Sequence, residues 1–246
     1  MAHANPKELP IEETVRFLEA ALPKPPCRVL EVGCGSGAVA ARLAGRGYHV
    51  TGLDASAEAI ADCRARGVQA VEGDFLSYRG GEPVDALLFT RSLHHIDSPA
   101  RAAERAHALL KPGGRIVAEE FAIERMDNDT ARWFYELRSL LEAAGVMSPD
   151  PAGEPLAATP LDRWFQDHEP ENPVHAGEDM LMALGTRFEL DRVVSTPYLY
   201  RYVCERVEAS DRGARVAHWV FELESLRIVE ATLRPVGLRV VGHRAR

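Results

Sequence analysis

Residues 29–37 read VLEVGCGSG, an apolar run that contains one acid, Glu31, and leads into glycines at alternate positions, Gly33, Gly35 and Gly37. The apolar run predicts a buried β-strand, and the small residues after it predict a turn into a following helix. A strand, a glycine turn and a helix together create a place where a ligand can contact backbone N–H groups and the positive end of the helix. Taken alone the pattern is weak, because tight turns that bind nothing also use glycine.

Strand-like and helix-like segments alternate on both sides of this turn. We expect helices at 11–22, 36–47, 56–67 and 98–114, and strands at 28–33, 48–54, 68–74, 84–90 and 115–121. This alternation is typical of parallel βαβ units with right-handed crossovers, which build a doubly wound α/β sheet with helices on both faces. Ligands of such sheets bind beyond the carboxyl ends of the strands. The residues that directly follow the strands are therefore the candidates for a binding site.

The pattern changes after residue 121. We expect helices at 130–144 and 178–187 with Pro- and Gly-rich loops between them, then a long strand at 188–204, a helix at 214–233 and a last strand at 237–244. Long segments of this kind in compact enzymes are commonly lids over a bound ligand. The sequence thus predicts one domain over residues 1–246, with a helical cap inserted at 122–186.

Composition argues against several classes of partner. Lys and Arg number 29 and Asp and Glu 37, so the net charge of −8 repels nucleic-acid phosphates and anionic membranes. The four cysteines form no CxxC pair, and no residue spacing indicates a metal site. The chain has no run of membrane-spanning length and no signal-peptide core at its start. We expect a cytoplasmic monomer or homodimer that acts on a small molecule, without nucleic acid, membrane or metal.

Four further segments carry a resemblance to a known family. VLEVGCGSG resembles the first motif of the Rossmann-fold (class I) S-adenosylmethionine-dependent methyltransferases of the small-molecule type. GLDAS (52–56), EGDF (72–75) and LLKPGGRIVAEE (109–120) match the family at their expected places, and DALLFTRSLHHI (85–96) fits its fourth-strand region. The match covers about residues 27–121, and the joint spacing is far more specific than any single motif. The resemblance implies a seven-stranded, mostly parallel sheet with an antiparallel last strand.

The resemblance also implies which residues bind S-adenosylmethionine. Asp54, with Ala55 beside it, ends the second strand, where its carboxylate accepts both ribose hydroxyls. Asp74 takes the adenine amino group, with the backbone of Phe75 alongside. The other residues implied for the cofactor face its methionine portion or its sulfonium: Glu31, Gly33, Cys34, Gly35, Thr90 and Arg91. Both aspartates keep a structural alternative, Asp54 as a helix cap and Asp74 as a turn residue.

Three residues after strands four and five are candidates for a catalytic base. Methyl transfer from a sulfonium is an in-line displacement, and a base is needed only where the acceptor must lose a proton early. Histidine titrates near neutrality, so His94 and His95 suit this role, although the pair has an alternative role in shaping its loop. Successive side chains of a strand point to opposite faces, so only one of Glu119 and Glu120 can face the ligand. The candidates named here are His95, His94 and Glu120.

The resulting hypothesis is methyl transfer to an O, N or C atom of a small molecule, with release of S-adenosylhomocysteine. The segment TRSLHHI lacks the [DNS]-P-P-[YF] sequence typical of methyltransferases that act on nucleic acid bases. Two alternatives stay open: an NAD(P)-dependent oxidoreductase, which would use Asp54 in the same way but leaves Asp74 without a role, and an inactive protein that binds the cofactor or a partner. The aromatic residues of 121–202 either wall the acceptor pocket or form the core of the insertion.

Overall fold

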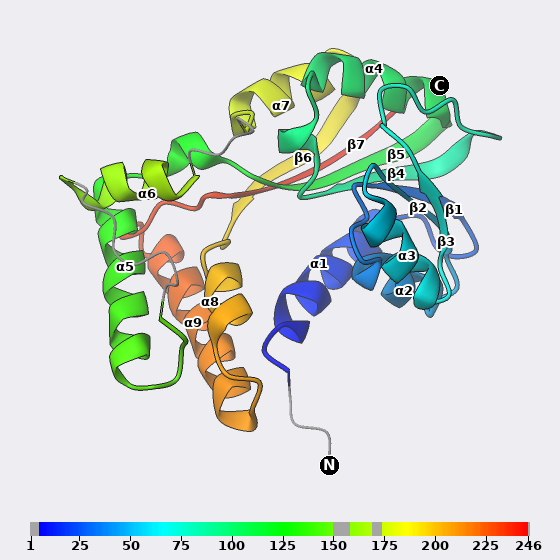
Figure 1. Ribbon diagram of the computed structural model, residues 1–246. Helices are drawn as coiled ribbons and strands as arrows, with labels where there is room; N and C mark the ends of the chain where they lie inside the picture. Colours follow the sequence, from blue (N-terminus) through cyan, green and yellow to red (C-terminus); the bar gives the residue numbers. More distant parts are fainter. Residues whose placement is uncertain (1–4, 150–157, 169–173, 246) are drawn as a thin grey trace. The chain divides into compact units, whose positions relative to one another are not determined.

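The protein is described by a computed structural model that covers residues 5–149, 158–168 and 174–245. Its chain forms two compact units (Figure 1). The sheet unit comprises Glu13–Phe121, His175–Val194 and Leu238–Arg246, and the helical unit comprises Met1–Glu12, Ala122–Val174 and Ser195–Gly237. These bounds differ from the expected insertion at 122–186, because residues 175–186 belong to the sheet unit and 195–237 to the helical unit. A role of the insertion as a cap stays a prediction.

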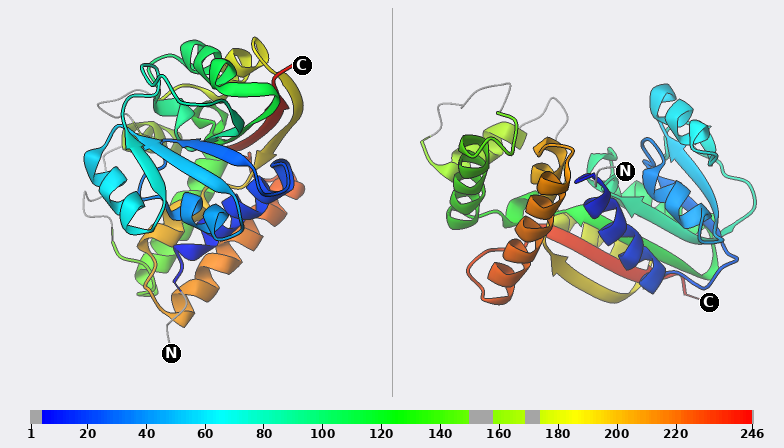
Figure 2. Two further views of the ribbon diagram at one scale, coloured as in Figure 1. Left: turned by 90° about the vertical axis from the view of Figure 1, so that its right-hand side faces the viewer. Right: turned by 90° about the horizontal axis from the view of Figure 1, so that it is seen from below.

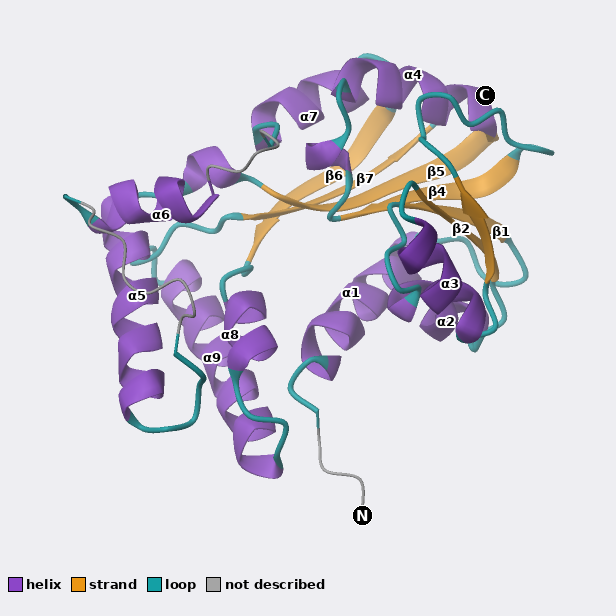
Figure 3. Cartoon of the chain, viewed as in Figure 1, coloured by secondary structure: helices purple, strands orange, loops and turns teal. Residues whose placement is uncertain are grey.

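The sheet has seven strands in the order β3-β2-β1-β4-β5-β7-β6 (Figure 3). Their bounds are β1 Arg28–Val32, β2 His49–Asp54, β3 Gln69–Glu72, β4 Val84–Thr90, β5 Leu110–Phe121, β6 Glu189–Thr196 and β7 Gly237–His243. β1 pairs in parallel with β2 and β4, β2 with β3, and β4 with β5. The last strand runs antiparallel, which confirms the doubly wound Rossmann-like sheet expected from the sequence.

Helices cover both faces of this sheet, with α4 and α7 on one face and α2 and α3 on the other (Figures 1 and 2). The helices that contribute to the sheet unit are α1 Glu8–Ala21, α2 Ala38–Ala44, α3 Ala57–Ala65, the short 3₁₀ helix η1 Leu93–His95, α4 Pro99–Leu109 and α7 Gly177–Gly185. Two of these helices, α3 and α4, begin at a serine N-cap. Ser56 accepts a hydrogen bond from the Ala59 N–H, and Ser98 accepts one from the Arg101 N–H. Between the layers, Leu87, Leu88 and Phe89 of β4 are completely buried, as parallel strands require.

The helix expected at 98–114 ends earlier, at Leu109, and the LKPGG segment belongs to β5. Pro112 favours extended backbone in the residue before it, which ends the helix. A Cβ on Gly114 would lie 3.2 Å from the carbonyl oxygen of Asp85 on the neighbouring β4, so glycine permits a close approach of the backbones there. Lys111 Nζ also lies 2.6 Å from Asp85 Oδ1. These contacts with β4 explain why β5 begins at Leu110, five residues earlier than the strand expected from the sequence at 115–121.

The helical unit contains two helices that the sequence analysis did not predict. Its elements are η2 Ile123–Arg125, α5 Asn128–Ala143, α6 Pro160–His168, α8 Tyr200–Arg206 and α9 Asp211–Val229. No helix was expected at α6, and the strand expected at 188–204 was wrong beyond Thr196, because α8 occupies its second half. A distant side chain starts α8: the buried carboxylate of Glu224 accepts the backbone N–H groups of Tyr198, Leu199 and Tyr200.

Aromatic side chains of the helical unit pack against one another. Trp164 is fully buried, and its ring centroid lies 5.8 Å from those of Phe134 and Tyr202 in edge-to-face geometry. Tyr198 joins the cluster 5.9 Å from Tyr202. These contacts favour the core interpretation of the aromatic residues.

The described part of the chain contains neither a membrane-spanning helix nor a group of side chains that could bind a metal ion. No helix within residues 5–149, 158–168 and 174–245 combines the length and apolar character needed to cross a membrane. Over the same ranges, histidine, cysteine and carboxylate side chains form no group that could hold a metal ion.

Candidate functional site

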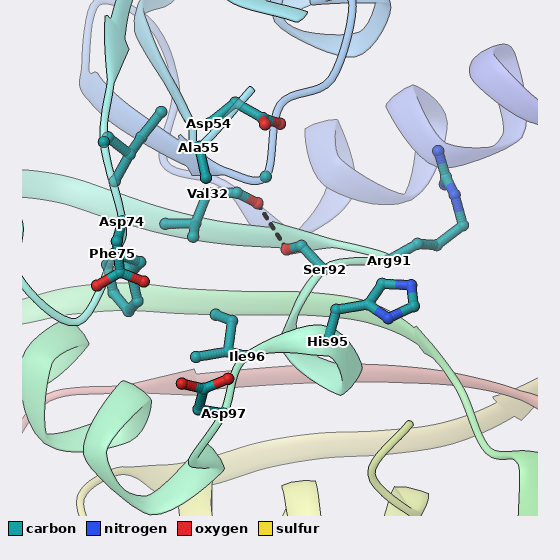
Figure 4. Close-up of a pocket in the computed structure, with 13 residues that line it drawn as sticks. Val32, Asp54, Ala55, Asp74, Phe75, Arg91, Ser92, His95, Ile96 and Asp97 are labelled. Carbon is teal, nitrogen blue, oxygen red and sulfur yellow. Dashed lines mark hydrogen bonds between the residues drawn. The ribbon is translucent and has the colours of Figure 1, made fainter. Parts of the chain in front are cut away.

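A cavity of about 330 Å³ opens in the sheet unit where β1, β2, β3 and β4 end (Figure 4). Seven of the residues that the sequence analysis named line it: Gly33, Asp54, Ala55, Asp74, Phe75, Arg91 and His95. Six more lining residues were not predicted: Val32, Leu53, Gly73, Ser92, Ile96 and Asp97. All six lie within two residues of a named position, so the signal for finding them was adjacency to the motifs.

The three glycines of the turn all have left-handed backbone, but their surroundings differ. A Cβ on Gly33 (φ 66) would lie 2.4 Å from Ser92 Cβ, and one on Gly37 (φ 75) would lie 2.5 Å from Cys63 Sγ. Gly35 (φ 51) has no atom within 4 Å of such a Cβ. Packing therefore demands glycine at positions 33 and 37, whereas Gly35 leaves open space beside the turn.

Asp54 connects the glycine turn to the end of β2. Its Oδ2 accepts the backbone N–H of Gly35 at 2.9 Å, and its Oδ1 accepts that of Ser56, also at 2.9 Å. Each carboxylate oxygen has two lone pairs, so both can accept a further hydrogen bond from a ligand in the cavity. Asp54 is not the helix cap named as its alternative, because Ser56 caps α3; its carboxylate instead connects the two turns and also lines the cavity (Figure 4).

Asp74 likewise combines a turn with a position on the cavity wall. Its Oδ1 accepts the Ser77 N–H, three residues later, at 3.0 Å, so its side chain closes the turn after β3. The neighbouring Phe75 is buried and its ring centroid lies 5.5 Å from that of Phe89, edge to face. That contact holds the Asp74–Phe75 backbone against the sheet beside the cavity.

Glu31 lies in the interior of β1 and is not a lining residue. Its side chain is almost completely buried, and Oε1 accepts the hydroxyl of Thr90 at 2.6 Å. Within the described residues Oε2 makes no hydrogen bond. Burial raises the pKa of Glu31 from 4.5 to about 7, although the Thr90 hydroxyl, the Arg91 charge and the backbone N–H of Ala40 act in the opposite direction. The Ala40 N–H is too far or too poorly aligned to count as a hydrogen bond by geometry. A buried carboxylate with one unsatisfied oxygen is costly unless a ligand compensates it.

Arg91 presents its backbone to the cavity and its guanidinium to the fold. It has left-handed backbone (φ 63), and its N–H donates to the carbonyl of Glu119 at 2.7 Å. In Figure 4 the Arg91 side chain points away from the labelled aspartates. The guanidinium Nη1 lies 3.1 Å from Glu119 Oε2 and donates to the Thr14 hydroxyl on α1. The second oxygen of Glu119 receives Arg239 Nε at 2.8 Å. Glu119 is therefore a structural carboxylate, and the guanidinium of Arg91 is held by the fold; a backbone contact of Arg91 with the cofactor stays a prediction.

Cys34 is placed by packing rather than by a ligand. Its buried thiol lies 3.9 Å from the sulfur of Cys63 on α3. Burial and then the neighbouring Cys63 raise the pKa of the Cys34 thiol far above its usual range, so it stays protonated. Neither Cys34 nor Gly35 nor Thr90 is a lining residue of the cavity.

Of the three candidate bases, one lines the cavity and the other two are buried beside it. His95 lines the cavity, whereas His94 and Glu120 are buried and do not. Glu120 Oε1 accepts the N–H groups of Ser92 and Leu93, and its Oε2 lies 2.5 Å from His94 Nδ1. The imidazoles of His94 and His95 are 4.1 Å apart. Glu120 and His94 thus do not reach the cavity as the sequence analysis expected; they hold the segment that carries His95.

Burial favours the neutral form of His95. Its pKa is lowered, first by burial and then by the neighbouring His94, while Glu120 acts in the opposite direction. A neutral imidazole on the cavity wall has a free lone pair for a proton.

Comparison with known proteins identifies the family. A family model described as "Methyltransferase domain" matches residues 1–168. A ubiquinone biosynthesis O-methyltransferase of Xylella fastidiosa (strain 9a5c) is 35% identical over 126 residues, which are 46% of this chain and 50% of that protein. An uncharacterized methyltransferase of Mycobacterium bovis is 32% identical over 117 residues, 46% of this chain and 59% of that protein. The chain spans about half the length of these curated relatives.

Solved structures share the fold at low identity. An S-adenosylmethionine-dependent methyltransferase from Mesorhizobium loti superimposes with a TM-score of 0.61 and 19% identity, covering 95% of this chain and 100% of that one. A geranyl diphosphate C-methyltransferase from Streptomyces coelicolor A3(2) gives 0.59 and 15%, covering 95% and 76%. Because the family model extends over more than half of the chain and the sheet order agrees with it, the protein belongs to the Rossmann-fold methyltransferase-domain family.

Proposed function

We propose that this protein transfers a methyl group from S-adenosylmethionine to a small-molecule acceptor. The observation that carries the proposal is the placement of two aspartates, Asp54 and Asp74, at the ends of neighbouring strands on one cavity wall, directly beside the glycine turn. Two carboxylates that line the same cavity suit a nucleoside, because its ribose hydroxyls and its adenine amino group are all hydrogen-bond donors.

The residues present fit the methionine portion as well. Within the described residues, Gly35 leaves open space at the turn. The buried Glu31 does not line the cavity, and its second oxygen makes no hydrogen bond in the described residues. We infer that this carboxylate favours a cationic amino group through its charge. The lining residues Gly33 and Arg91 offer backbone contacts between these ends. When bound, S-adenosylmethionine supplies a methyl group on a sulfonium, which is already a strong electrophile.

His95 is the residue we assign to the acceptor proton. It is a cavity-lining side chain whose pKa is lowered, so its neutral form is available to accept a proton from a hydroxyl or amine. Glu120 and His94 are positioning residues, because one accepts the backbone N–H groups that begin η1 and the other packs against the His95 ring.

The acceptor class follows from weaker observations. The net charge of −8 disfavours a nucleic-acid acceptor. One relative is named an O-methyltransferase and one structural neighbour a C-methyltransferase, so acceptors with an ionisable oxygen are the first class to screen, followed by nitrogen and carbon acceptors.

Two measurements test the proposal. S-adenosylhomocysteine should raise the melting temperature of the full chain and NAD should not, since ligands stabilise in proportion to their affinity. Turnover is then followed by release of S-adenosylhomocysteine over a panel of phenols, carboxylates and amines. Stabilisation by NAD alone would favour an oxidoreductase, whereas binding of S-adenosylhomocysteine without turnover on any acceptor would favour an inactive binding protein.

A further inference from the structure

Helix α9 has two apolar faces. The first packs inside the helical unit through Ala217 and Val220, which are buried. The second is exposed: Trp219 is 70% exposed, Leu226 53% and Leu223 38%. With the half-buried Val216, the second face has the spacing 216, 219, 223, 226, which corresponds to the a and d positions of two heptads. A regular stripe of this kind is uncommon on a surface that only meets water.

Helix α5 extends this face. A groove of about 410 Å³ runs between α5 and α9. It is lined by Leu137 and Leu141 from α5, and by Val216, Leu223, the edge of the buried Val220 and the arginines Arg212 and Arg215 from α9. Leu140, on the same part of α5, is 66% exposed. Trp219 also lines this groove and is mostly exposed, so the face combines a large protruding side chain with an apolar groove beside it.

Opposite charges flank the stripe on one edge. Arg215 lies four residues before Trp219, and Glu222 lies three residues after it. They are seven residues apart, or about two helical turns, so both lie on the same edge of α9. Arg215 is exposed, and Glu222 has only a 3.9 Å contact with the exposed His218. Such an exposed pair contributes little, which leaves Glu222 available to a stronger partner.

We propose that this face binds a second copy of the same chain, with the two α9 helices packed antiparallel. A two-fold axis near Val216 and Trp219 places each Val216 against the partner's Trp219. Arg215 and Glu222 occupy equivalent g positions of successive heptads, and antiparallel coiled coils bring g positions together. Each Arg215 then lies opposite the partner's Glu222, so the ion pair forms twice. A two-fold interface requires exactly this reciprocity, in which one patch complements itself.

Charge and area both favour a second copy over an unrelated partner. Across the axis the basic residue meets the acidic one without any change of sequence. A stable interface buries roughly 600 Å² or more on each side, and a single Trp can contribute about 150–250 Å² of that. Around an axis near Val216 and Trp219, Leu226 lies beyond the overlap of the two helices, so the apolar area comes mainly from Trp219, Leu223 and Leu140.

Sedimentation velocity and light scattering on the full chain, over a range of concentrations, test the proposal. The 27.1 kDa chain should convert to twice that mass as its concentration rises. Trp219→Glu should weaken self-association at least ~10-fold, because hot-spot aromatics dominate such interfaces. Met182→Glu is the control, since Met182 is 66% exposed but lies on α7 in the sheet unit.

A charge exchange makes the test specific for the antiparallel arrangement. Arg215→Glu and Glu222→Arg should each weaken the dimer, and the double variant should restore it, because both pairs are then rebuilt with reversed sign. Circular dichroism and stabilisation by S-adenosylhomocysteine check that every variant is folded, and none of these residues lines the candidate site. A monomer at every concentration, a dimer as sensitive to Met182→Glu as to Trp219→Glu, or a double variant that stays weak would each overturn the proposal.

Discussion

Glu31 in the sheet unit and Glu224 in the helical unit are two buried glutamates with opposite hydrogen-bonding environments. Both are 1% exposed, and burial raises the pKa of each from 4.5 to about 7. Glu224 receives three backbone N–H groups on its two oxygens at 2.7–3.0 Å. Glu31 receives the Thr90 hydroxyl on one oxygen, and within the described residues its other oxygen has no hydrogen-bond partner.

The difference identifies Glu224 as a carboxylate that builds the fold, and it is the reason why we propose a ligand role for Glu31. Burying a charge costs free energy, and Glu224 offsets that cost inside its own unit by starting α8. Glu31 leaves part of the cost uncompensated, which a protein tolerates where a ligand completes the site. Burial or pKa alone would not distinguish the two residues; their hydrogen bonds do.

The largest effect on stability is expected for Glu224→Ala. The variant leaves the N–H groups of Tyr198, Leu199 and Tyr200 without their acceptor, so the free energy of unfolding should fall by about 3–5 kcal/mol. Glu31→Ala removes only one hydrogen bond and should cost about 1–2 kcal/mol. Urea denaturation followed by tryptophan fluorescence measures both, and equal losses would show that the comparison is wrong.

The same contrast between fold and site applies to the adjacent histidines. His95→Gln should lower kcat by ~100-fold without weakening S-adenosylhomocysteine binding, because it removes the base but no cofactor contact. His94→Gln should mainly lower stability, since His94 is buried against Glu120. Steady-state kinetics and calorimetric titration separate these outcomes. A tenfold effect or less on kcat for His95→Gln would make both histidines loop-shaping residues.

Asp54 combines a role in the fold with a place in the candidate site, because its oxygens accept backbone N–H groups and its side chain also lines the cavity. Asp54→Ala should weaken S-adenosylhomocysteine about 10- to 100-fold, or about 1.5–3 kcal/mol, through loss of the charge-assisted contacts to the ribose. Asp85→Ala, which removes a carboxylate from the other end of the sheet, is the matched control. An unchanged dissociation constant in isothermal titration would refute the ribose assignment.

The smallest effect is a pH dependence that belongs to Glu31. With a pKa of about 7 in the folded chain against 4.5 ordinarily, the stabilising contribution of the protonated form is complete below pH 4.5 and is lost as pH rises through 7. A bound amino group needs the ionised form, so binding releases a proton, and affinity for S-adenosylhomocysteine should fall about tenfold from pH 8 to pH 6.

Glu31→Gln tests this assignment directly. The variant should bind about tenfold more weakly at pH 8 and lose the pH dependence, because glutamine does not titrate. Glu224→Gln should keep the wild-type dependence, since Glu224 lies in the helical unit. Cys34 and Cys63 surround Glu31, but their raised pKa values keep them protonated throughout this range. A slope that survives in Glu31→Gln would assign the titration to another group.

The candidate site was predictable in part because its residues follow strands. Asp54 is the last residue of β2, and Gly33 and Asp74 lie one and two residues after the ends of β1 and β3; parallel strands bring such positions to one edge of the sheet. The buried partners were not predictable in the same way. Glu119 meets Arg239, 120 residues later in the chain, and local periodicity contains no information on that pairing.

The sequence by itself determined the alternating strands and helices up to Phe121, the glycine turn and the aspartates of the cavity, because these depend on local periodicity and backbone conformation. Only the tertiary structure decided the two segments that were predicted wrongly. LKPGG joined β5 through its contacts with β4, and residues 200–206 became helical where a strand was expected. In the second case the deciding group is Glu224, which lies 24 residues beyond Tyr200 and supplies the acceptor for the first N–H groups of α8. A residue that far along the chain reaches the start of a helix only when the unit has folded. The local sequence of residues 200–206 therefore could not predict α8.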